Sequence, residues 1–334
     1  MKKITYKVDR NSYHYDWSLL FIKKETLMKL KLLTLMIVVF SLNLFASNSI
    51  ITTDKGKTVN LQQIAADKSD VYFFGEYHDN AFLHKQEIDF LKTLYKKNKN
   101  IAVSMEMFER DVQDKLNQYL SGKMSEKDFL KETRAWPNYK TDYKPIIEFA
   151  KKHHLPVIAA NIPRRYASMM RKKGKTAIES LPKNERKFIA KDYVFKNDQY
   201  RKEFFKVMDS NMGNKMPKQL KDKIFQKYYE AQCLKDETMA ESIAKFMEKH
   251  PKTVIVHFNG DFHSRYHLGT AQKLQDRVID KKITVISPVV TNVKTEAKFV
   301  PQLSGIGDYL IIFYEPAPKH ENKPQGKMFK TKAK

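Results

Sequence analysis

Short apolar runs alternate with amphipathic stretches along most of this chain, and the alternation restricts the fold more than any other feature. Six runs have the length and composition of buried strands: Val71–Phe74, Ile101–Met105, Pro156–Ala160, Thr253–Val256, Ile283–Ile286 and Tyr309–Phe313. Four stretches between them carry apolar residues at helical spacing: Asn80–Lys97, Asp111–Thr133, Tyr143–His153 and Ser264–Arg277. This order predicts an α/β fold, a mostly parallel sheet flanked by helices.

The stretch between Pro163 and His250 contains no strand signal and is polar, helical and rich in Met, Phe and Tyr. We interpret it as a helical insertion or cap, over about residues 164–250, in one α/β domain that spans residues 47–315. Residues 316–334 are rich in lysine and proline and have few apolar residues, so we expect a disordered basic tail there.

The N-terminal region has the pattern of an export signal. Met28-Lys29-Leu30-Lys31 is followed by 14 mostly apolar residues, Leu32–Phe45, and then by Ala46-Ser47. A membrane span needs roughly 20 residues, so the pattern predicts a signal peptide over residues 28–46. Residues 1–27 form a doubtful extension before it. No cysteine lies near Ala46, so a lipid anchor is not expected, and we place the protein in the periplasm or peripherally on a membrane.

The basic charge of the chain does not indicate a nucleic-acid partner. Lys and Arg number 62 against 38 Asp and Glu, a net charge of +24, but the two signs are mixed along the whole chain. No basic stripe with interleaved aromatic residues is present, which favours a solvated Lys/Glu-rich surface. The single cysteine, Cys233, excludes an intrachain disulfide and a cysteine-based zinc cluster, and we expect its side chain to be buried.

Polar residues follow four of the predicted strands at the point where each strand ends. They are Glu76 and His78, then Glu106, then Asn161 and Arg164, and finally His257 and His263. The carboxyl ends of parallel strands meet at one edge of a sheet, where open α/β sheets bind ligands. The sequence therefore predicts a polar ligand site at this edge.

Each of these residues also has a purely structural interpretation. Asp79 or Asn80 would cap the next helix, Glu76 would pair with Arg164, and Glu106 would pair with Arg164 or Arg110. His257 continues an apolar strand, so it suits a core position as well as a ligand. Five other histidines are interpreted as helix-surface residues: His84, His153, His154, His250 and His267.

Aromatic residues gather in the segment Trp136–Pro145, which contains Tyr139 and Tyr143. Such a loop suits a large, flat, hydrophobic ligand. It equally suits packing of the segment against the sheet, and the sequence leaves both possibilities open.

Several motifs together resemble the ChaN-like family, in the same order along the chain. They are Gly75-Glu76-Tyr77-His78-Asp79-Asn80, Glu106–Arg110, Trp136-Pro137 with Tyr143-Lys144-Pro145, Asn161–Arg164, Ala231–Ala240 and His257–His263. The resemblance covers roughly residues 60–315. The Gly-Glu-x-His motif is also similar to that of the more distant Tiki, TraB and erythromycin esterase proteins.

The resemblance implies an exported haem-binding protein of haem and iron uptake. It implies haem as cofactor, bound through a tyrosine ligand, with a homodimer on haem loading and a haem receptor or transporter as a further partner. The candidate ligands are Tyr139, Tyr143 and Tyr77, since tyrosinate is an established axial ligand of haem iron. Arg164 and His257 are further candidates for contact with haem.

The alternative hypothesis is a metal-dependent hydrolase, a Tiki-like protease or esterase. Glu76, His78, Glu106 and His263 would be its catalytic residues, with a divalent metal on Glu76, His78 and His263 that activates water. Without metal, a His–Glu pair would act as general base. We favour a binding protein over an enzyme on the resemblance, whereas the strand-end residues agree more directly with the hydrolase.

Overall fold

The structure is a computed structural model that describes residues 49–212, 216–291 and 297–315. The predicted extension (1–27), signal peptide (28–46) and basic tail (316–334) lie outside the described residues. Within the described ranges, no helix combines the length and the apolar character needed to cross a membrane.

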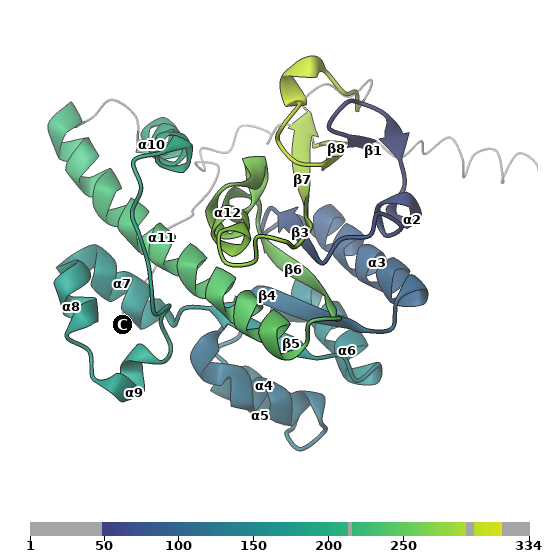
Figure 1. Ribbon diagram of the computed structural model, residues 1–334, viewed down its shortest axis with the longest axis horizontal. Helices are drawn as coiled ribbons and strands as arrows, with labels where there is room; N and C mark the ends of the chain where they lie inside the picture. The colour runs from purple at the N-terminus through teal and green to yellow at the C-terminus, as the bar shows by residue number, and fades with distance from the viewer. Residues whose placement is uncertain (1–48, 213–215, 292–296, 316–334) are drawn as a thin grey trace, which may run out of the picture. The chain divides into compact units, whose positions relative to one another are not determined.

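The sheet contains the six predicted strands and two more, in the order β2-β1-β8-β7-β3-β6-β4-β5 (Figure 1). From β8 to β5 all neighbours are parallel, whereas β1 is antiparallel to both β8 and β2. The strands are β1 (Ser49–Thr53), β2 (Thr58–Val59), β3 (Val71–Glu76), β4 (Ile101–Glu109), β5 (Val157–Asn161), β6 (Val254–Gly260), β7 (Ile283–Thr291) and β8 (Tyr309–Tyr314). The predicted α/β fold with a mostly parallel sheet is thus confirmed.

The order in which the chain visits the strands determines where a ligand site can form. The chain runs from β3 to β4 and β5 toward one edge, then returns through β6 and continues to β7 and β8 toward the other edge. The direction therefore reverses around β3, β6 and β4. In open α/β sheets, the crevice outside the carboxyl ends at such a reversal is the usual ligand position.

Helices cover both faces of the sheet. They are α2 (Leu61–Ile64), α3 (Ala81–Lys97), α4 (Gln113–Leu120), α5 (Glu126–Glu132), α6 (Lys144–Lys152), α7 (Arg164–Lys173), α8 (Lys175–Glu179), α9 (Lys183–Arg186), α10 (Gln199–Met212), α11 (Lys218–Lys249) and α12 (Gly269–Gln275). Asn80 caps α3, as predicted, because its side chain accepts a hydrogen bond from the Leu83 backbone N–H at 3.0 Å.

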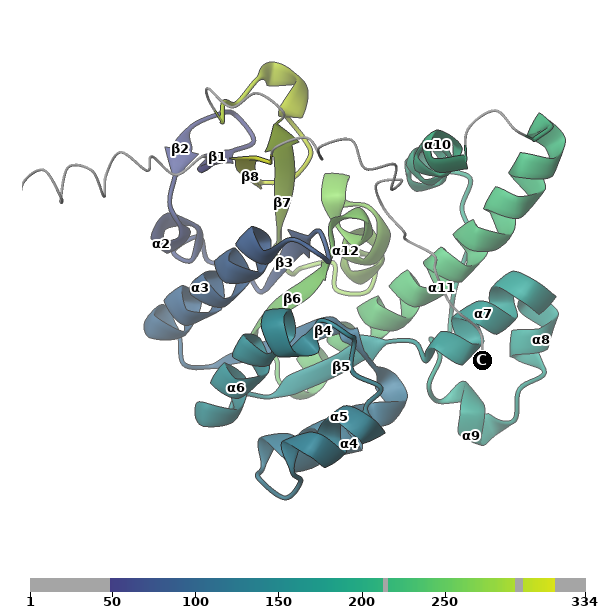
Figure 2. The same ribbon diagram turned by 180° about the vertical axis from the view of Figure 1, so that it is seen from behind.

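The alternation of side chains along each strand divides the core into two layers. Tyr72, Phe74, Met105 and Phe258 face α3 and α6, in what we call the α3 face. Residues at the alternate positions of the same strands, such as Phe73 and Ile255, face α11 and α12, in what we call the α11 face. Figures 1 and 2 show α11 on one side of the sheet and α3 with α6 on the other.

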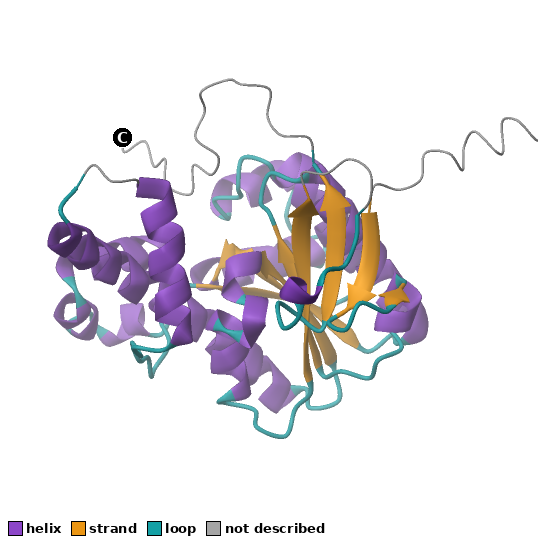
Figure 3. Cartoon of the chain, turned by 90° about the horizontal axis from the view of Figure 1, so that it is seen from above, coloured by secondary structure: helices purple, strands orange, loops and turns teal. Residues whose placement is uncertain are grey.

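Between β5 and β6 the described chain forms helices only, and these make a lobe beside the sheet (Figure 3). The spine of the lobe is α11, whose first half packs against α7 and α10 and whose second half packs on the sheet. Cys233 lies in this core and is buried, as predicted.

Two details depart from the sequence prediction. The helix predicted from Ser264 begins only at Gly269, because Tyr266 and His267 have positive φ angles of 59° and 54° that a helix does not allow. The strands β1 and β2, of which β2 lies at the edge of the sheet, were not predicted.

The other edge strand, β5, has a partner for its free backbone groups. The side-chain amide of Gln113, on α4, donates to the Val157 carbonyl at 2.8 Å and accepts from the Ala159 N–H at 2.7 Å. Gln113 thus occupies two groups with which a further strand would pair.

Candidate functional site

Two buried polar clusters lie at the carboxyl edge of the sheet, one on each face. Glu76 ends β3 and points to the α3 face, whereas Glu106, on β4, points to the α11 face. Each carboxylate organises its own set of partners. We call the two sets the Glu76 cluster (Glu76, His78, His84, Glu87 and Tyr143) and the Glu106 cluster (Glu106, His263 and Asp236).

In the Glu76 cluster, one carboxylate oxygen holds two partners. Glu76 Oε1 lies 2.6 Å from His78 Nδ1 and accepts the Tyr143 hydroxyl at 2.8 Å. Burial alone would raise the pKa of Glu76, but the hydrogen bond and the charge of His78 lower it, so Glu76 is ionised. Burial and the neighbouring Glu76 carboxylate raise the pKa of Glu87 well above its ordinary value.

In the Glu106 cluster, an imidazole lies between two carboxylates. His263 Nε2 is 3.2 Å from Glu106 Oε1, and His263 Nδ1 is 2.5 Å from Asp236 Oδ1. Burial would lower the pKa of His263, yet the two carboxylates raise it to about 10. The charge and the hydrogen bond of His263 in turn lower the pKa of Glu106 against the effect of burial. His263 is therefore an imidazolium at neutral pH, which cannot accept a proton.

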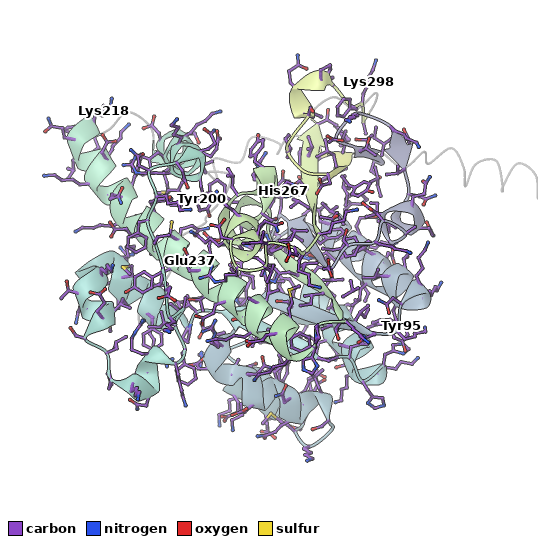
Figure 4. The ribbon with its side chains drawn as sticks, viewed as in Figure 1. Tyr95, Tyr200, Lys218, Glu237, His267 and Lys298 are labelled. Carbon is purple, nitrogen blue, oxygen red and sulfur yellow. The ribbon has the colours of Figure 1, made fainter. Side chains whose placement is uncertain are left out.

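Asp236 is held in place by further hydrogen bonds. The Tyr200 hydroxyl donates to Asp236 Oδ2 at 2.7 Å, and the Thr270 hydroxyl donates to Oδ1 at 2.8 Å. Tyr200, labelled in Figure 4, belongs to the first turn of α10. Asp236 itself lies on α11, so the lobe contributes directly to the cluster.

His78 lies beside Gly260, at the end of β6, on the side of the Glu76 cluster that is nearest to the Glu106 cluster. A Cβ atom at Gly260 would lie 2.9 Å from His78 Nε2 and 3.5 Å from Glu106 Oε2, and the Gly260 N–H donates to Glu106 Oε2 at 2.8 Å. Only glycine allows this approach. The imidazole of His78 is 37% exposed, whereas the other residues of both clusters are buried. The site therefore presents His78, oriented by Glu76, to solvent.

Several predicted structural pairings are wrong. Glu106 pairs with His263 and not with an arginine, because Arg110 bonds to Glu241, Ser242 and the Thr238 carbonyl on α11. The Glu76–Arg164 pairing is also wrong, because the hydrogen bonds of Glu76 go to His78 and Tyr143 and the Arg164 side chain is exposed at the start of α7.

His257 lies behind the Glu106 cluster and does not reach the edge. It is fully buried, and its Nδ1 is 2.9 Å from the Ser104 hydroxyl. Burial lowers the pKa of His257 to about 3, so it is a neutral core residue. This position matches the core interpretation, and it gives a ligand at the surface no access to His257.

The three predicted haem tyrosines differ in exposure. Tyr139 and Tyr143 are buried in the core, where Tyr139 packs against Phe108 and Phe129, so neither hydroxyl faces a ligand outside the core. Tyr77 is partly buried and donates to the Pro288 carbonyl at 3.1 Å. Trp136, from the same aromatic segment, lies with its ring centre 4.9 Å from that of His78.

The predicted metal ligands do not converge. His78 Nδ1 is occupied by Glu76, and both nitrogens of His263 face carboxylates of the other cluster. Among the described residues, the group with metal-ligand geometry is Glu76, His84 and Glu87, whose donor atoms lie within 4.8 Å of one another.

The sequence interpretation missed His84, Glu87, Asp236 and Tyr266. His84, interpreted as a surface residue, is 4% exposed. A signal for it existed, because His84, Glu87, Leu91 and Leu94 recur at helical spacing on the buried side of α3. Asp236 likewise lies among buried α11 residues. No sequence pattern indicated Tyr266, because it lies in a turn with positive φ angles after β6 and not on a regular helix or strand.

Chemically, the edge offers an exposed imidazole held by a buried carboxylate, beside a fixed imidazolium. A carboxylate-bound imidazole is the arrangement used for general base catalysis and also for presenting a nitrogen ligand. Together, fold and edge define an α/β protein with a histidine–carboxylate ligand site at the carboxyl ends of its parallel strands.

The comparisons with known proteins assign this chain to a family. It belongs to the family described as "Haem-binding uptake, Tiki superfamily, ChaN", whose model matches residues 64–274. No curated protein sequence matches the chain.

One solved structure has the same fold, and two others are similar at lower scores. A structure of ChaN of Campylobacter jejuni, described as showing cofacial haem binding, has a TM-score of 0.59 at 17% identity and covers 79% of this chain and 96% of that one. An erythromycin esterase in an open conformation gives 0.42 at 9% identity, over 72% and 77% of the two chains. A Bacillus cereus protein gives 0.41 at 14% identity, over 70% of each chain.

Proposed function

We propose that this chain is an exported protein of haem uptake that binds haem at the carboxyl edge of its sheet. The observation that carries the proposal is the family match over residues 64–274. Support for haem itself comes from the Campylobacter jejuni protein of the same fold, whose structure is described as binding haem cofacially.

The donor groups near the edge suit haem. Tyr266, in the turn after β6, is 39% exposed, and the guanidinium of Arg265 lies 5.0 Å from the centre of its ring. A phenolate is a hard anionic ligand for ferric iron, and a guanidinium suits a propionate. His78 adds an exposed imidazole. When bound, haem would supply a ferric iron that takes an anionic oxygen or an imidazole nitrogen as ligand.

We propose Tyr266 as the iron ligand, with Tyr77 as the second choice. Tyr266 is the tyrosine with an exposed ring among the described residues, whereas Tyr77 already donates to a backbone carbonyl. The φ angle of Tyr266, 59°, costs of order 1–3 kcal/mol, and backbone strain of this kind is often found at binding sites.

Haem loading would join two copies of the chain, since cofacial haems lie against one another. The loaded dimer would then pass haem to a receptor or transporter. Export would proceed through the predicted signal peptide, residues 28–46.

The test is a titration of the purified chain with ferric haem, followed by its visible absorption spectrum. We expect saturable binding near one haem per chain, a tyrosinate-type ferric spectrum and dimerisation on loading. Tyr266→Phe would change the Soret band and weaken binding at least about tenfold, since it removes the only anionic contact to iron. Tyr139→Phe is the matched control, because the buried Tyr139 hydroxyl has no hydrogen-bond partner.

Two outcomes would change the proposal. Unsaturable binding by the wild-type chain would overturn haem binding as its function. Saturable binding with an unchanged Tyr266→Phe spectrum would move the ligand to Tyr77.

Hydrolysis at the same edge is a second candidate function, carried by the hydrogen bond between Glu76 and His78. His78 is the exposed imidazole of the edge, so it is placed to act as general base once it has lost its proton. The carboxylates of Glu76 and Glu106 raise the pKa of His78 against the effect of burial, so this activity would increase as the pH rises. Glu76→Gln would then reduce ester or peptide hydrolysis about 10²–10⁴-fold. A chain that hydrolyses none of these substrates would count against this candidate and leave haem binding intact.

A further inference from the structure

Glu76, His84 and Glu87 form a buried group that none of the functions above uses as a unit. Glu76 ends β3, while His84 and Glu87 lie one turn apart in the first half of α3. The exposed fractions of Glu76, His84 and Glu87 are 1%, 4% and 0%. The group lies behind His78, away from the open edge where we place haem.

His78 compensates the charge of Glu76, but the second carboxyl group, that of Glu87, has no such cationic partner. Two carboxylic acids face one imidazole, and Asp142 Oδ2 lies 3.7 Å from His84 Nε2 as a third acid. The other histidine, His78, already bonds to Glu76 Oε1. Since uncompensated buried carboxylates are very costly, the group must hold either a proton or a cation.

Two carboxylate oxygens of the group are not used in hydrogen bonds and are available as metal ligands. Glu76 Oε2 and Glu87 Oε1 are buried and have no hydrogen-bond partner. His84 Nε2 lies 3.1 Å from the His78 carbonyl oxygen, which can only accept, so this nitrogen carries the hydrogen. The lone pair of His84 Nδ1 is then directed at the two carboxylates. An imidazole whose second N–H binds a carbonyl is the usual arrangement of a metal-ligating histidine.

The distances agree with a small divalent ion. His84 Nδ1 is 2.9 Å from Glu87 Oε2 and 3.4 Å from Glu76 Oε2. For metal–ligand bonds of about 2.1 Å, neighbouring ligands lie about 3.0 Å apart in an octahedron and about 3.4 Å apart in a tetrahedron. The two distances from His84 thus match the spacing of ligands around one ion, and the two carboxylates lie within 4.8 Å of each other, so a common ion requires them to approach.

We infer that Glu76, His84 and Glu87 bind a divalent transition-metal ion, with Zn²⁺ as the probe, which fastens α3 to the end of β3. The ion compensates the charge of the Glu87 carboxylate and leaves Glu76 Oε1 free to hold His78. It is thus a positioning element behind the ligand site, and it does not depend on haem binding.

The experiment measures metal content and thermal unfolding of the purified full chain. The chain is stripped with a chelator, dialysed against Zn²⁺ and freed of excess ion. We expect one equivalent of zinc per chain and a higher melting temperature for the loaded protein. Glu87→Gln, which keeps the side-chain volume and a hydrogen bond, should weaken zinc binding at least about 100-fold.

The matched control is Asp89→Asn, because Asp89 is a half-exposed acid on the same helix that pairs with Lys85. It should leave zinc stoichiometry and melting temperature unchanged. If Glu87→Gln binds zinc as the wild type does, or if the wild-type chain binds none, the inference is overturned and the group holds a proton.

X-ray absorption of the zinc-loaded wild-type chain provides a readout that needs no variant. One imidazole with oxygen ligands is expected. A shell with two or more imidazoles would instead place the ion on His78 and His263 and overturn the assignment.

Discussion

At the residue scale, the two glycines of the edge show how closely the backbone and the polar groups are packed. A Cβ at Gly75 would lie 2.7 Å from Asp261 Oδ1, as a Cβ at Gly260 would collide with His78. Gly75 and Gly260 therefore allow Asp261 and His78 to approach the backbone, because they have no side chain. The glycines of the Gly75–Asn80 and His257–His263 motifs are thus explained by packing, whatever the chemistry of the neighbouring residues.

Asp261 gives the clearest pH prediction at this scale. Burial raises its pKa from 3.8 to about 6, which corresponds to about 3 kcal/mol. The fold favours the protonated acid, so this contribution to stability is fully present below about pH 4 and is lost as the pH rises through about 6.

The neutral variant Asp261→Asn should therefore be more stable than wild type by up to about 3 kcal/mol at about pH 8, and nearly equal to it at about pH 3.5. Urea unfolding of both proteins at the two pH values measures this difference. A difference in unfolding free energy that does not vary with pH would contradict the assignment.

The site residues at the ends of strands could be predicted from the sequence. Their partners on helices could not. Glu76, His78, Glu106 and His263 lie in the carboxyl-terminal parts of strands or just after them, so strand order alone brought them to one edge. Their division between two faces needs only the alternation of strand side chains. Asp236 could not be predicted to meet His263, because the contact depends on how α11 lies across the sheet.

At the element scale, α11 and the end of β6 are joined by the contact between Asp236 and His263. Breaking a buried ion pair by removing one charge costs about 3–5 kcal/mol, since the remaining charge stays buried. Asp236→Asn should lower the unfolding free energy by about that amount and lower the pKa of His263. Chemical denaturation and NMR titration of His263 measure the two effects.

Asp276→Asn is the matched control for this prediction. Asp276 is more than half exposed, and its 3.5 Å pair with Lys196 is a surface contact that contributes at most about 1 kcal/mol. Equal losses in the two variants would show that Asp236 has no special role.

The strand β1, which lies between β2 and β8, shows why some elements cannot be predicted from local sequence. Ser49–Thr53 is five residues long and pairs with β8, whose partner residues are about 260 positions later in the chain. No local pattern reports such a pairing. The same argument applies to the late start of α12, because the positive φ angles of Tyr266 and His267 belong to a loop whose backbone bonds to Ile306.

At the scale of the whole molecule, the sheet has an open edge at β5 that the Gln113 side chain covers. Gln113→Ala would expose the Val157 carbonyl and the Ala159 N–H, at a cost of about 1–2 kcal/mol. We expect faster aggregation on heating, followed by light scattering. Gln118→Ala, at an exposed position of the same helix, is the control and should aggregate as the wild type does.

The continuity of α11 has a mechanical consequence. With 32 residues it is about 48 Å long, and Asp236 lies near its midpoint, between the half inside the lobe and the half on the sheet. Because the helix is continuous, a displacement of its outer half would also displace Asp236 and alter its contact with His263. A protein bound to the outer helices of the lobe would therefore change the geometry of the carboxyl edge without contacting the site.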